Sequence, residues 1–164
     1  MIVFAVTGWS GAGKTRLMTR LIATFNSRGL RVLAAKHAGH GASLQPEGKD
    51  SGAYLEAGAE TAAVLSGIEL LQIRRYGDAD AAADELRGQW AAYDVVLLEG
   101  RAYLDVPFVE VLAPDSPGIR APRERLAAVV TDQDGDYPGP RFSWDEVDKL
   151  AEFMEEYNGL SGLS

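Results

Sequence analysis

The sequence has no cysteine, and only two of its 164 residues are histidine. The lack of cysteine excludes disulfide scaffolds, cysteine-ligated zinc sites and thiol nucleophiles. The longest apolar runs, at residues 2–6 and 126–130, fall far short of the roughly 20 residues that span a bilayer. Residues 1–6 also lack the basic start of a secretory signal, so we expect a cytoplasmic protein without a membrane segment.

Composition and charge narrow the class of protein further. With 46% hydrophobic and 24% charged residues, the chain is typical of one globular domain over residues 1–164. The formal net charge is -8, yet residues 1–50 carry seven Lys or Arg against two Asp or Glu. An acidic chain with one basic segment is poorly suited to nucleic-acid binding and well suited to a small anionic ligand held near the N-terminus.

Apolar periodicity predicts strands that alternate with helices. The expected strands are residues 2–6, 31–36, 62–65, 70–76, 95–98, 108–112 and 126–130, with 62–65 and 70–76 paired as a hairpin through Gly67. The expected helices follow Thr15, span about 50–57, run from Asp78 or Asp80 to about Ala91, and begin at the capping-box pair Ser143 and Glu146. Residues 37–49 are expected to form an extended functional loop. This order predicts an α/β fold around a mainly parallel sheet.

A glycine-rich loop follows the first expected strand. Its sequence, Gly8-Trp9-Ser10-Gly11-Ala12-Gly13-Lys14-Thr15, satisfies the G-x-x-x-x-G-K-[ST] pattern of a phosphate-binding loop. Small residues let successive backbone N–H groups turn toward a phosphate chain, and the start of the next helix adds partial positive charge. Lys14 would neutralise the β- and γ-phosphates, and the Thr15 hydroxyl would ligate Mg²⁺. We therefore expect one P-loop NTPase-like domain, a three-layer sandwich that binds a nucleoside triphosphate.

A carboxylate ends the strand expected at residues 95–98. Glu99 occupies the place of a Walker B residue, where it could orient a magnesium-bound water or polarise the attacking water. Asp94 is the weaker candidate, because it lies at the opposite end of the strand from the edge where ligands bind in such sheets. Glu99 and Thr15 are thus the expected metal ligands, and Lys14 and Glu99 the expected catalytic groups.

Five further segments, read in order after the phosphate loop, give the sequence a family resemblance. These are Lys36-His-Ala-Gly-His40, Gly48-Lys-Asp-Ser51, Ala57-Gly-Ala59, Leu98-Glu-Gly100 and Glu110-Val111. With them the chain resembles the MobB family of molybdopterin-guanine dinucleotide biosynthesis proteins over essentially its whole length. The resemblance implies a GTP-binding protein with weak GTPase activity, usually a homodimer. It also implies that the protein assists the MobA-like guanylyltransferase that joins GMP to molybdopterin.

The resemblance also assigns residues to the site. Gly11, Gly13, Lys14 and Thr15 would hold phosphate and Mg²⁺. His37, His40, Lys49, Asp50 and Ser51 would belong to a signature loop beside the nucleotide or the pterin, which makes molybdopterin a further candidate ligand. Apart from the resemblance, an arginine that supplies charge in the transition state could be Arg16, Arg101 or a side chain of a partner protein. The sequence differs from the family pattern at Gln45, Gly52, Arg101-Ala102 and Phe108.

Other interpretations remain open from the residues alone. Asp132 follows a strand and could accept hydrogen bonds from N1 and N2 of guanine, or it could serve only in a turn. His37 and His40 could ligate a metal only with carboxylates such as Asp50, so a phosphate-facing role fits them better. A small P-loop kinase with Asp50 as the base, and a nucleotide-gated protein scaffold, are the alternative functions.

Overall fold

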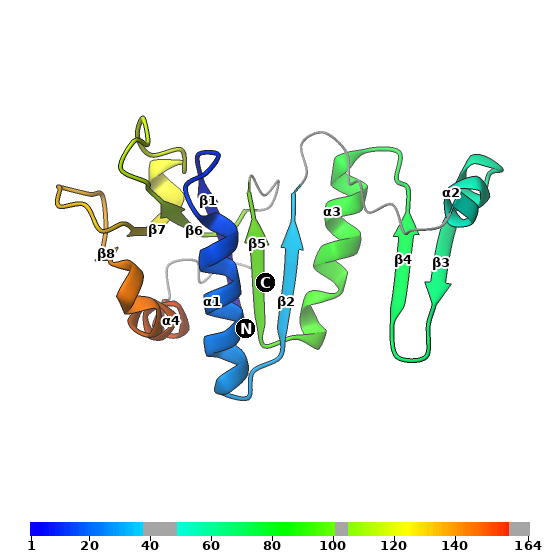
Figure 1. The fold of residues 1–164 in the computed structure, drawn as a ribbon, viewed down its shortest axis with the longest axis horizontal. Coiled ribbons are helices and arrows are strands. Elements are labelled where there is room, and N and C mark those ends of the chain that lie inside the picture. The colour runs from blue at the N-terminus through cyan, green and yellow to red at the C-terminus, as the bar shows by residue number, and fades with distance from the viewer. Residues whose placement is uncertain (38–48, 101–104, 158–164) are drawn as a thin grey trace. The chain divides into compact units, whose positions relative to one another are not determined.

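The computed structural model describes residues 1–37, 49–100 and 105–157, and these form two compact units (Figure 1). We call Met1–His37 with Gly88–Ser164 the sheet unit, and Ala38–Arg87 the hairpin unit. No helix among the described residues is long and apolar enough to cross a membrane.

The sheet unit is built on one parallel sheet in the strand order β2-β5-β1-β6-β7-β8. Its strands are β1 (Ile2–Gly8), β2 (Val32–Lys36), β5 (Val95–Glu99), β6 (Phe108–Val111), β7 (Leu126–Val130) and β8 (Arg141–Phe142). Every residue of β5 and β6 is buried, as is typical of inner strands covered on both faces. The α/β class and the mainly parallel sheet are confirmed, and β1 lies between β5 and β6 inside the sheet.

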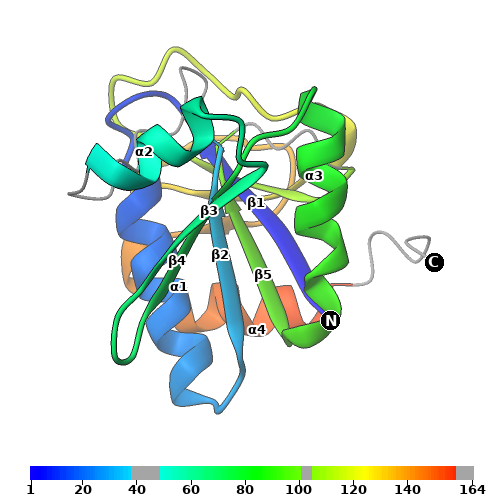
Figure 2. The same ribbon diagram turned by 90° about the vertical axis from the view of Figure 1, so that its right-hand side faces the viewer.

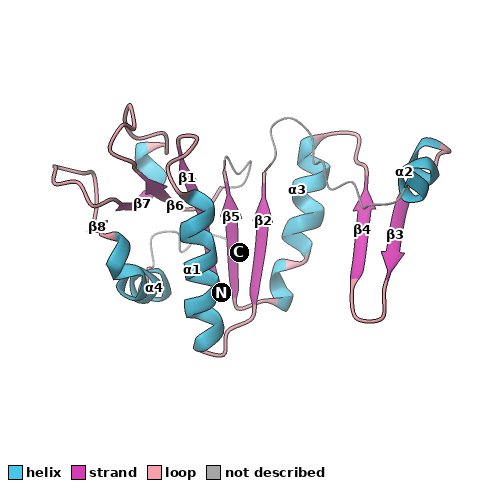
Figure 3. Cartoon of the chain, viewed as in Figure 1, coloured by secondary structure: helices cyan, strands magenta, loops and turns pink. Residues whose placement is uncertain are grey.

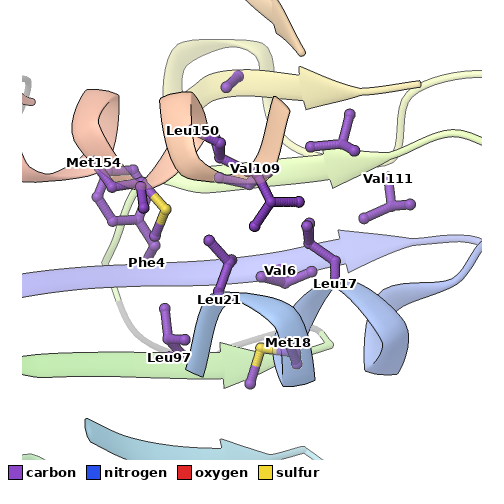
Figure 4. Close-up of a cluster of buried hydrophobic side chains, with 14 of the residues drawn as sticks. Phe4, Val6, Leu17, Met18, Leu21, Leu97, Val109, Val111, Leu150 and Met154 are labelled. Carbon is purple, nitrogen blue, oxygen red and sulfur yellow. The ribbon is translucent and has the colours of Figure 1, made fainter. Parts of the chain in front are cut away.

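Two helices pack against each other and against β1 (Figure 4). The helices are α1 (Lys14–Ser27) and α4 (Val147–Glu156), and each buries one apolar stripe. On α1 the buried residues are Leu17, Met18, Leu21 and Phe25, and on α4 they are Val147, Leu150, Ala151 and Met154. Both stripes follow the spacing of apolar residues along a helix. They meet Phe4 and Val6 of β1 in one core, which fixes the start of α1 against the sheet.

The hairpin unit pairs β3 (Thr61–Leu65) with β4 (Leu70–Arg74) in the antiparallel sense, as predicted. Figure 2 shows their tight turn at one end, and α2 (Lys49–Glu56) lies at the other. The helix α3 (Ala79–Gly88) belongs to this unit apart from its last residue, and Glu85 on α3 forms an ion pair with Arg74 at 3.6 Å. The cartoon in Figure 3 separates these helices and strands by type.

Two helix boundaries and one short strand show the main differences from the sequence prediction. The third expected helix ends at Gly88 rather than near Ala91, and the short 3-10 helix η1 (Trp90–Ala92) follows it and buries Trp90. The Ser143–Glu146 capping box is present, but it opens the 3-10 turn η3 (Trp144–Glu146) before α4 begins. The two-residue strand β8 was missed, because two residues carry no periodic signal. The loop expected at residues 37–49 lies almost entirely outside the described residues.

Candidate nucleotide site

The phosphate loop lies at the carboxyl edge of the parallel sheet. The strand register places Val6 beside Glu99, Glu99 beside Lys36, and Gly8 beside Val111. The ends of β1, β2, β5 and β6 therefore share one edge, which is where open α/β sheets bind their ligands. Residues distant in sequence meet there because the strands run parallel.

The backbone of the loop depends on glycine. Gly8, Gly11 and Gly13 all have positive φ, at 146°, 78° and 100°. A Cβ on Gly8 would lie 2.5 Å from the Val111 carbonyl oxygen, and a Cβ on Gly13 would lie 2.9 Å from the Trp144 ring. Ala12 is buried between them, whereas Trp9, Ser10 and Gly11 are exposed. The sequence therefore produces a tight loop that leads directly into α1, the arrangement of an anion-binding helix start.

Lys14 is folded back over this loop. Its Nζ donates hydrogen bonds to the carbonyl oxygens of Gly8 at 3.1 Å and Trp9 at 2.9 Å. The ammonium group thus lies on the loop itself, in reach of any anion that the loop amides hold.

Thr15, Glu99 and Lys36 form a second polar cluster at the same edge. The Thr15 hydroxyl donates to Glu99 Oε2 at 2.9 Å, and Lys36 Nζ lies 3.2 Å from Glu99 Oε1. Glu99 is only 7% exposed, so the lysine and the hydroxyl compensate a largely buried carboxylate. A hydroxyl oxygen and a carboxylate are the hard ligands that Mg²⁺ prefers, so this pair fits that cation. The backbone N–H of His37 donates to the Glu99 carbonyl at 2.9 Å.

Aromatic and charged side chains brace the loop from two directions. The Arg16 guanidinium stacks on Trp144 at 4.7 Å, beside Gly13. On the other side, the Trp9 indole N–H donates to the Gly118 carbonyl at 2.7 Å, and Arg120 lies over the Trp9 ring at 4.8 Å. The segment that holds Gly118 and Arg120 is therefore tied to the phosphate loop.

Glu110 anchors the same segment from inside the sheet. Its carboxylate is fully buried and accepts the backbone N–H groups of Arg120 at 3.1 Å and Ala121 at 2.9 Å. Burial raises the pKa of Glu110, and the two N–H donors oppose that shift.

The predicted site residues fall into three groups. Gly8 to Arg16, His37 and Glu99 lie together at the sheet edge. Lys49, Asp50 and Ser51 begin α2 of the hairpin unit, and their side chains are not described. His40 and Arg101 lie outside the described residues. Within the described part of the chain, no group of three His, Asp or Glu side chains could hold a metal ion.

Two contributors to the site were missed by sequence reasoning. Lys36 was named only in a segment that carries the family resemblance and was given no role, although its place at the end of an expected strand was a usable signal. Trp144 lies 131 residues after Gly13, and no local pattern could place its ring against the phosphate loop.

A parallel sheet with a glycine loop leading from its central strand into a helix defines a P-loop NTPase-like α/β protein. Residues 3–132 match the family model MobB, described as molybdopterin guanine dinucleotide synthesis protein B. The chain belongs to the MobB family.

Related sequences and solved structures are similar over most of the chain. The molybdopterin-guanine dinucleotide biosynthesis adapter protein of Haemophilus influenzae is 28% identical over 94% of this chain and 88% of its own length. The adapter protein of the same name from Escherichia coli is 29% identical over 94% of this chain and 92% of its own. A crystal structure of molybdopterin-guanine biosynthesis protein B has a TM-score of 0.69 and 29% identity, covering 94% of this chain and 97% of that one. Bacillus subtilis MobB, at 22% identity and a TM-score of 0.71 over 96% of this chain and 100% of that one, shares the fold.

Proposed function

We propose that this protein binds GTP and Mg²⁺ at the phosphate loop and acts as an adapter in molybdopterin guanine dinucleotide biosynthesis. One observation carries the nucleotide assignment: Thr15 Oγ1 lies 2.9 Å from Glu99 Oε2 at the mouth of the glycine loop. Family membership and the relatives named as adapter proteins support the pathway.

Each residue of the site has a defined task under this proposal. The loop amides and the start of α1 bind the phosphate chain, and Lys14 Nζ turns from the Gly8 and Trp9 carbonyls toward it. Thr15 and Glu99 would hold Mg²⁺, which supplies neutralisation of the phosphate charge. Until the cation binds, the Lys36 ammonium group balances the negative charge of the Glu99 carboxylate.

We expect hydrolysis by the protein alone to be slow. Arg16, one candidate for stabilising charge in the transition state, stacks on Trp144 at 4.7 Å instead of reaching over the phosphate loop. Rates of unassisted GTPases, ~10⁻⁴ to 10⁻² s⁻¹, are therefore expected. Turnover of several per second without a partner would contradict the adapter role.

The partner under this proposal is a MobA-like guanylyltransferase. Molybdopterin is a further candidate ligand, for which residues 37–51 would supply the contacts. The test is sedimentation of the protein mixed with a molybdopterin-loaded guanylyltransferase. We expect a complex when GTP is present and none when GDP replaces it. Nucleoside diphosphate release that depends on an added metabolite would instead favour a small kinase.

The hairpin unit supports the proposal that the protein is a homodimer. Its turn exposes Leu65 by 79%, Ile68 by 98% and Leu70 by 65%. In the described structure, β3 and β4 form backbone hydrogen bonds only with each other, so both outer edges of this two-stranded sheet lack a strand partner. A second copy of the chain would cover this apolar surface.

The lysine of the loop provides the direct test of nucleotide binding. Lys14→Ala removes a charge-assisted contact worth about 1.5 to 3 kcal/mol, so the Kd for GTP should rise by about tenfold or more. Isothermal titration with Mg²⁺ and GTP measures this. Arg87→Ala, which removes an exposed cation that pairs with Asp84 on α3, is the matched control and should leave the Kd unchanged. Equal affinity of Lys14→Ala and the unaltered protein would refute the assignment.

A further inference from the structure

Glu110 is a buried carboxylate outside the pair of residues expected to hold Mg²⁺. Its side chain is 0% exposed, and its neighbours along β6, Val109 and Val111, pack into the core formed with α1 and α4. Because successive side chains of a strand point to opposite faces, Glu110 lies on the other face of the sheet. The strand register places it beside Thr7 of β1, one residue before the phosphate loop begins.

The Glu110 carboxylate holds a later segment of the chain. Residues 112–122 are irregular, and two consecutive backbone N–H groups of this stretch donate to the carboxylate, from Arg120 at 3.1 Å and from Ala121 at 2.9 Å. Burying a carboxylate on an inner strand is costly, and these bonds, one to each oxygen, compensate that cost. We call residues 118–121 the bracing segment, and Glu110 is its anchor in the sheet.

The bracing segment also holds Trp9 of the phosphate loop. The Gly118 carbonyl accepts the Trp9 indole N–H at 2.7 Å, and the Arg120 guanidinium lies 4.8 Å from the centre of the Trp9 ring. A cation over an aromatic face is an attractive contact. Because the Trp9 side chain is 39% exposed, these two contacts fix its orientation more than burial does.

The backbone of Trp9 in turn supports the groups that would bind phosphate. Its carbonyl oxygen accepts hydrogen bonds from Lys14 Nζ at 2.9 Å and from the Ala12 backbone N–H at 3.2 Å. The first bond places the ammonium group, and the second closes the turn of the loop. A continuous chain of contacts therefore runs from Glu110 through the bracing segment and Trp9 to Lys14.

We propose that Glu110 is a positioning residue for phosphate binding: through the bracing segment it holds Trp9, and through Trp9 it keeps the phosphate loop in its binding conformation. This inference rests on the proposed function and adds a residue that acts on the loop from outside it. A loop already held in its bound conformation binds more tightly, because less order has to be gained on binding. The coupling is reciprocal, so a bound triphosphate should stabilise the bracing segment by the same factor.

The first test removes the charge of Glu110 and keeps its shape. In Glu110→Gln one side-chain oxygen still accepts a backbone N–H, but the amide NH₂ faces the other N–H, so the bracing segment is released. The Kd for GTP with Mg²⁺ should rise about fivefold or more, as is usual for two coupled sites. Isothermal titration measures the Kd, and urea unfolding confirms that the variant is folded.

Glu124→Gln is the matched control for this change. Glu124 is exposed, and its side chain makes no ion pair or hydrogen bond with the described residues. The same exchange of carboxylate for amide should therefore leave the Kd for GTP unchanged. A rise in the Kd equal to that of Glu110→Gln would show that the loss of a negative charge, and not the bracing segment, weakens binding, and would overturn the proposal.

A second pair of variants separates positioning from a loss of stability. Trp9→Ala removes the ring and the indole N–H that the bracing segment holds, at an exposed position, and should raise the Kd for GTP by a similar factor. Adding Glu110→Gln to Trp9→Ala should then change the Kd no further, because the chain of contacts is already broken. A merely structural role of Glu110 would raise the Kd by the same factor in both backgrounds, and that result would overturn the proposal.

Hydrogen exchange tests the coupling in the unaltered protein, whether or not Glu110→Gln folds. Saturation with GTP and Mg²⁺ should slow the exchange of the backbone N–H groups of residues 118–121, and this slowing should be absent in Trp9→Ala. No slowing in the unaltered protein, or an unchanged Kd in folded Glu110→Gln, would overturn the positioning role and leave phosphate binding intact. If neither GTP nor inorganic tripolyphosphate bound to the unaltered protein, the proposed function itself would be overturned.

Discussion

At the scale of single residues, Gly8 and Glu146 show how local chemistry shapes the site. Gly8 combines a φ of 146° with a backbone oxygen 2.5 Å from the place of a Cβ, so no other residue fits. Glu146 closes the capping box by accepting the Ser143 backbone N–H at 3.0 Å. That box positions Trp144 against the phosphate loop.

Gly8→Ala should lower the free energy of unfolding by about 3 kcal/mol, because left-handed strain and a backbone clash act together. Gly29→Ala is the control, since Gly29 also has a positive φ, 79°, but its Cβ would meet open space. The control should lose only about 1 kcal/mol. Urea unfolding of both variants measures the difference, and equal losses would show that the Val111 contact carries no cost.

The capping box should stabilise the folded protein less at acidic pH. The Lys149 ammonium, followed by the Ser143 N–H, lowers the pKa of Glu146 from 4.5 to about 2. A depressed pKa stabilises the folded state fully above pH 4.5, and the benefit is lost as the pH falls toward 2. In urea unfolding, the stability difference between the unaltered protein and Glu146→Gln should therefore shrink between pH 6 and pH 3. A difference that stays constant over this range would contradict the assignment.

At the scale of elements, the helices that pack on β1 hold the phosphate loop in place. Leu21 of α1 is fully buried in the core shared with β1 and α4 (Figure 4). Most of the stabilisation of this corner comes from such contacts, because a 14-residue helix is marginal alone.

Leu21→Ala should cost about 2 to 5 kcal/mol, the range for a large-to-small change in a packed core. Ile22→Ala, at a partly buried neighbour, should cost less. Thermal unfolding of both variants followed by circular dichroism gives the comparison. If the two losses were the same, the face assigned to α1 would be wrong.

Most of the helices and strands could be predicted from the sequence. Buried strands such as β1 and β5 read as unbroken apolar runs, and the stripes of α1 and α4 follow the helical repeat. The end of α3 and the strand β8 could not be predicted, because Trp90 is buried by tertiary packing and two residues set no period.

The candidate site was predictable only where it is local. The loop from Gly8 to Thr15 is contiguous, and Glu99 follows a recognisable strand. The contact of Trp144 with Gly13, and the place of Asp132 beside it, depend on the order of β6, β7 and η3. Strand order depends on packing between residues far apart in the sequence, so no local sequence pattern predicts it.

At the scale of the whole molecule, the proposed dimer can be tested through the exposed hairpin turn. Ile68→Asp replaces the most exposed apolar side chain among the described residues with a charged one. The variant dimer should therefore dissociate at a higher protein concentration than the unaltered dimer. Sedimentation velocity over a concentration series measures this. Ser27→Asp adds the same charge at the end of α1 and should have no effect. If neither variant altered the dissociation of the dimer, the contact between the subunits would lie elsewhere on the protein.

The strand order also bears on how the chain folds as it leaves the ribosome. β2 pairs only with β5, and β1 lies between β5 and β6, so neither of the first two strands has a neighbour until residues 95–111 have been synthesised. Until then the apolar face of β1 stays uncovered by other strands. The nascent chain should therefore depend on chaperones during translation, and a stall before residue 95 should leave it prone to aggregate.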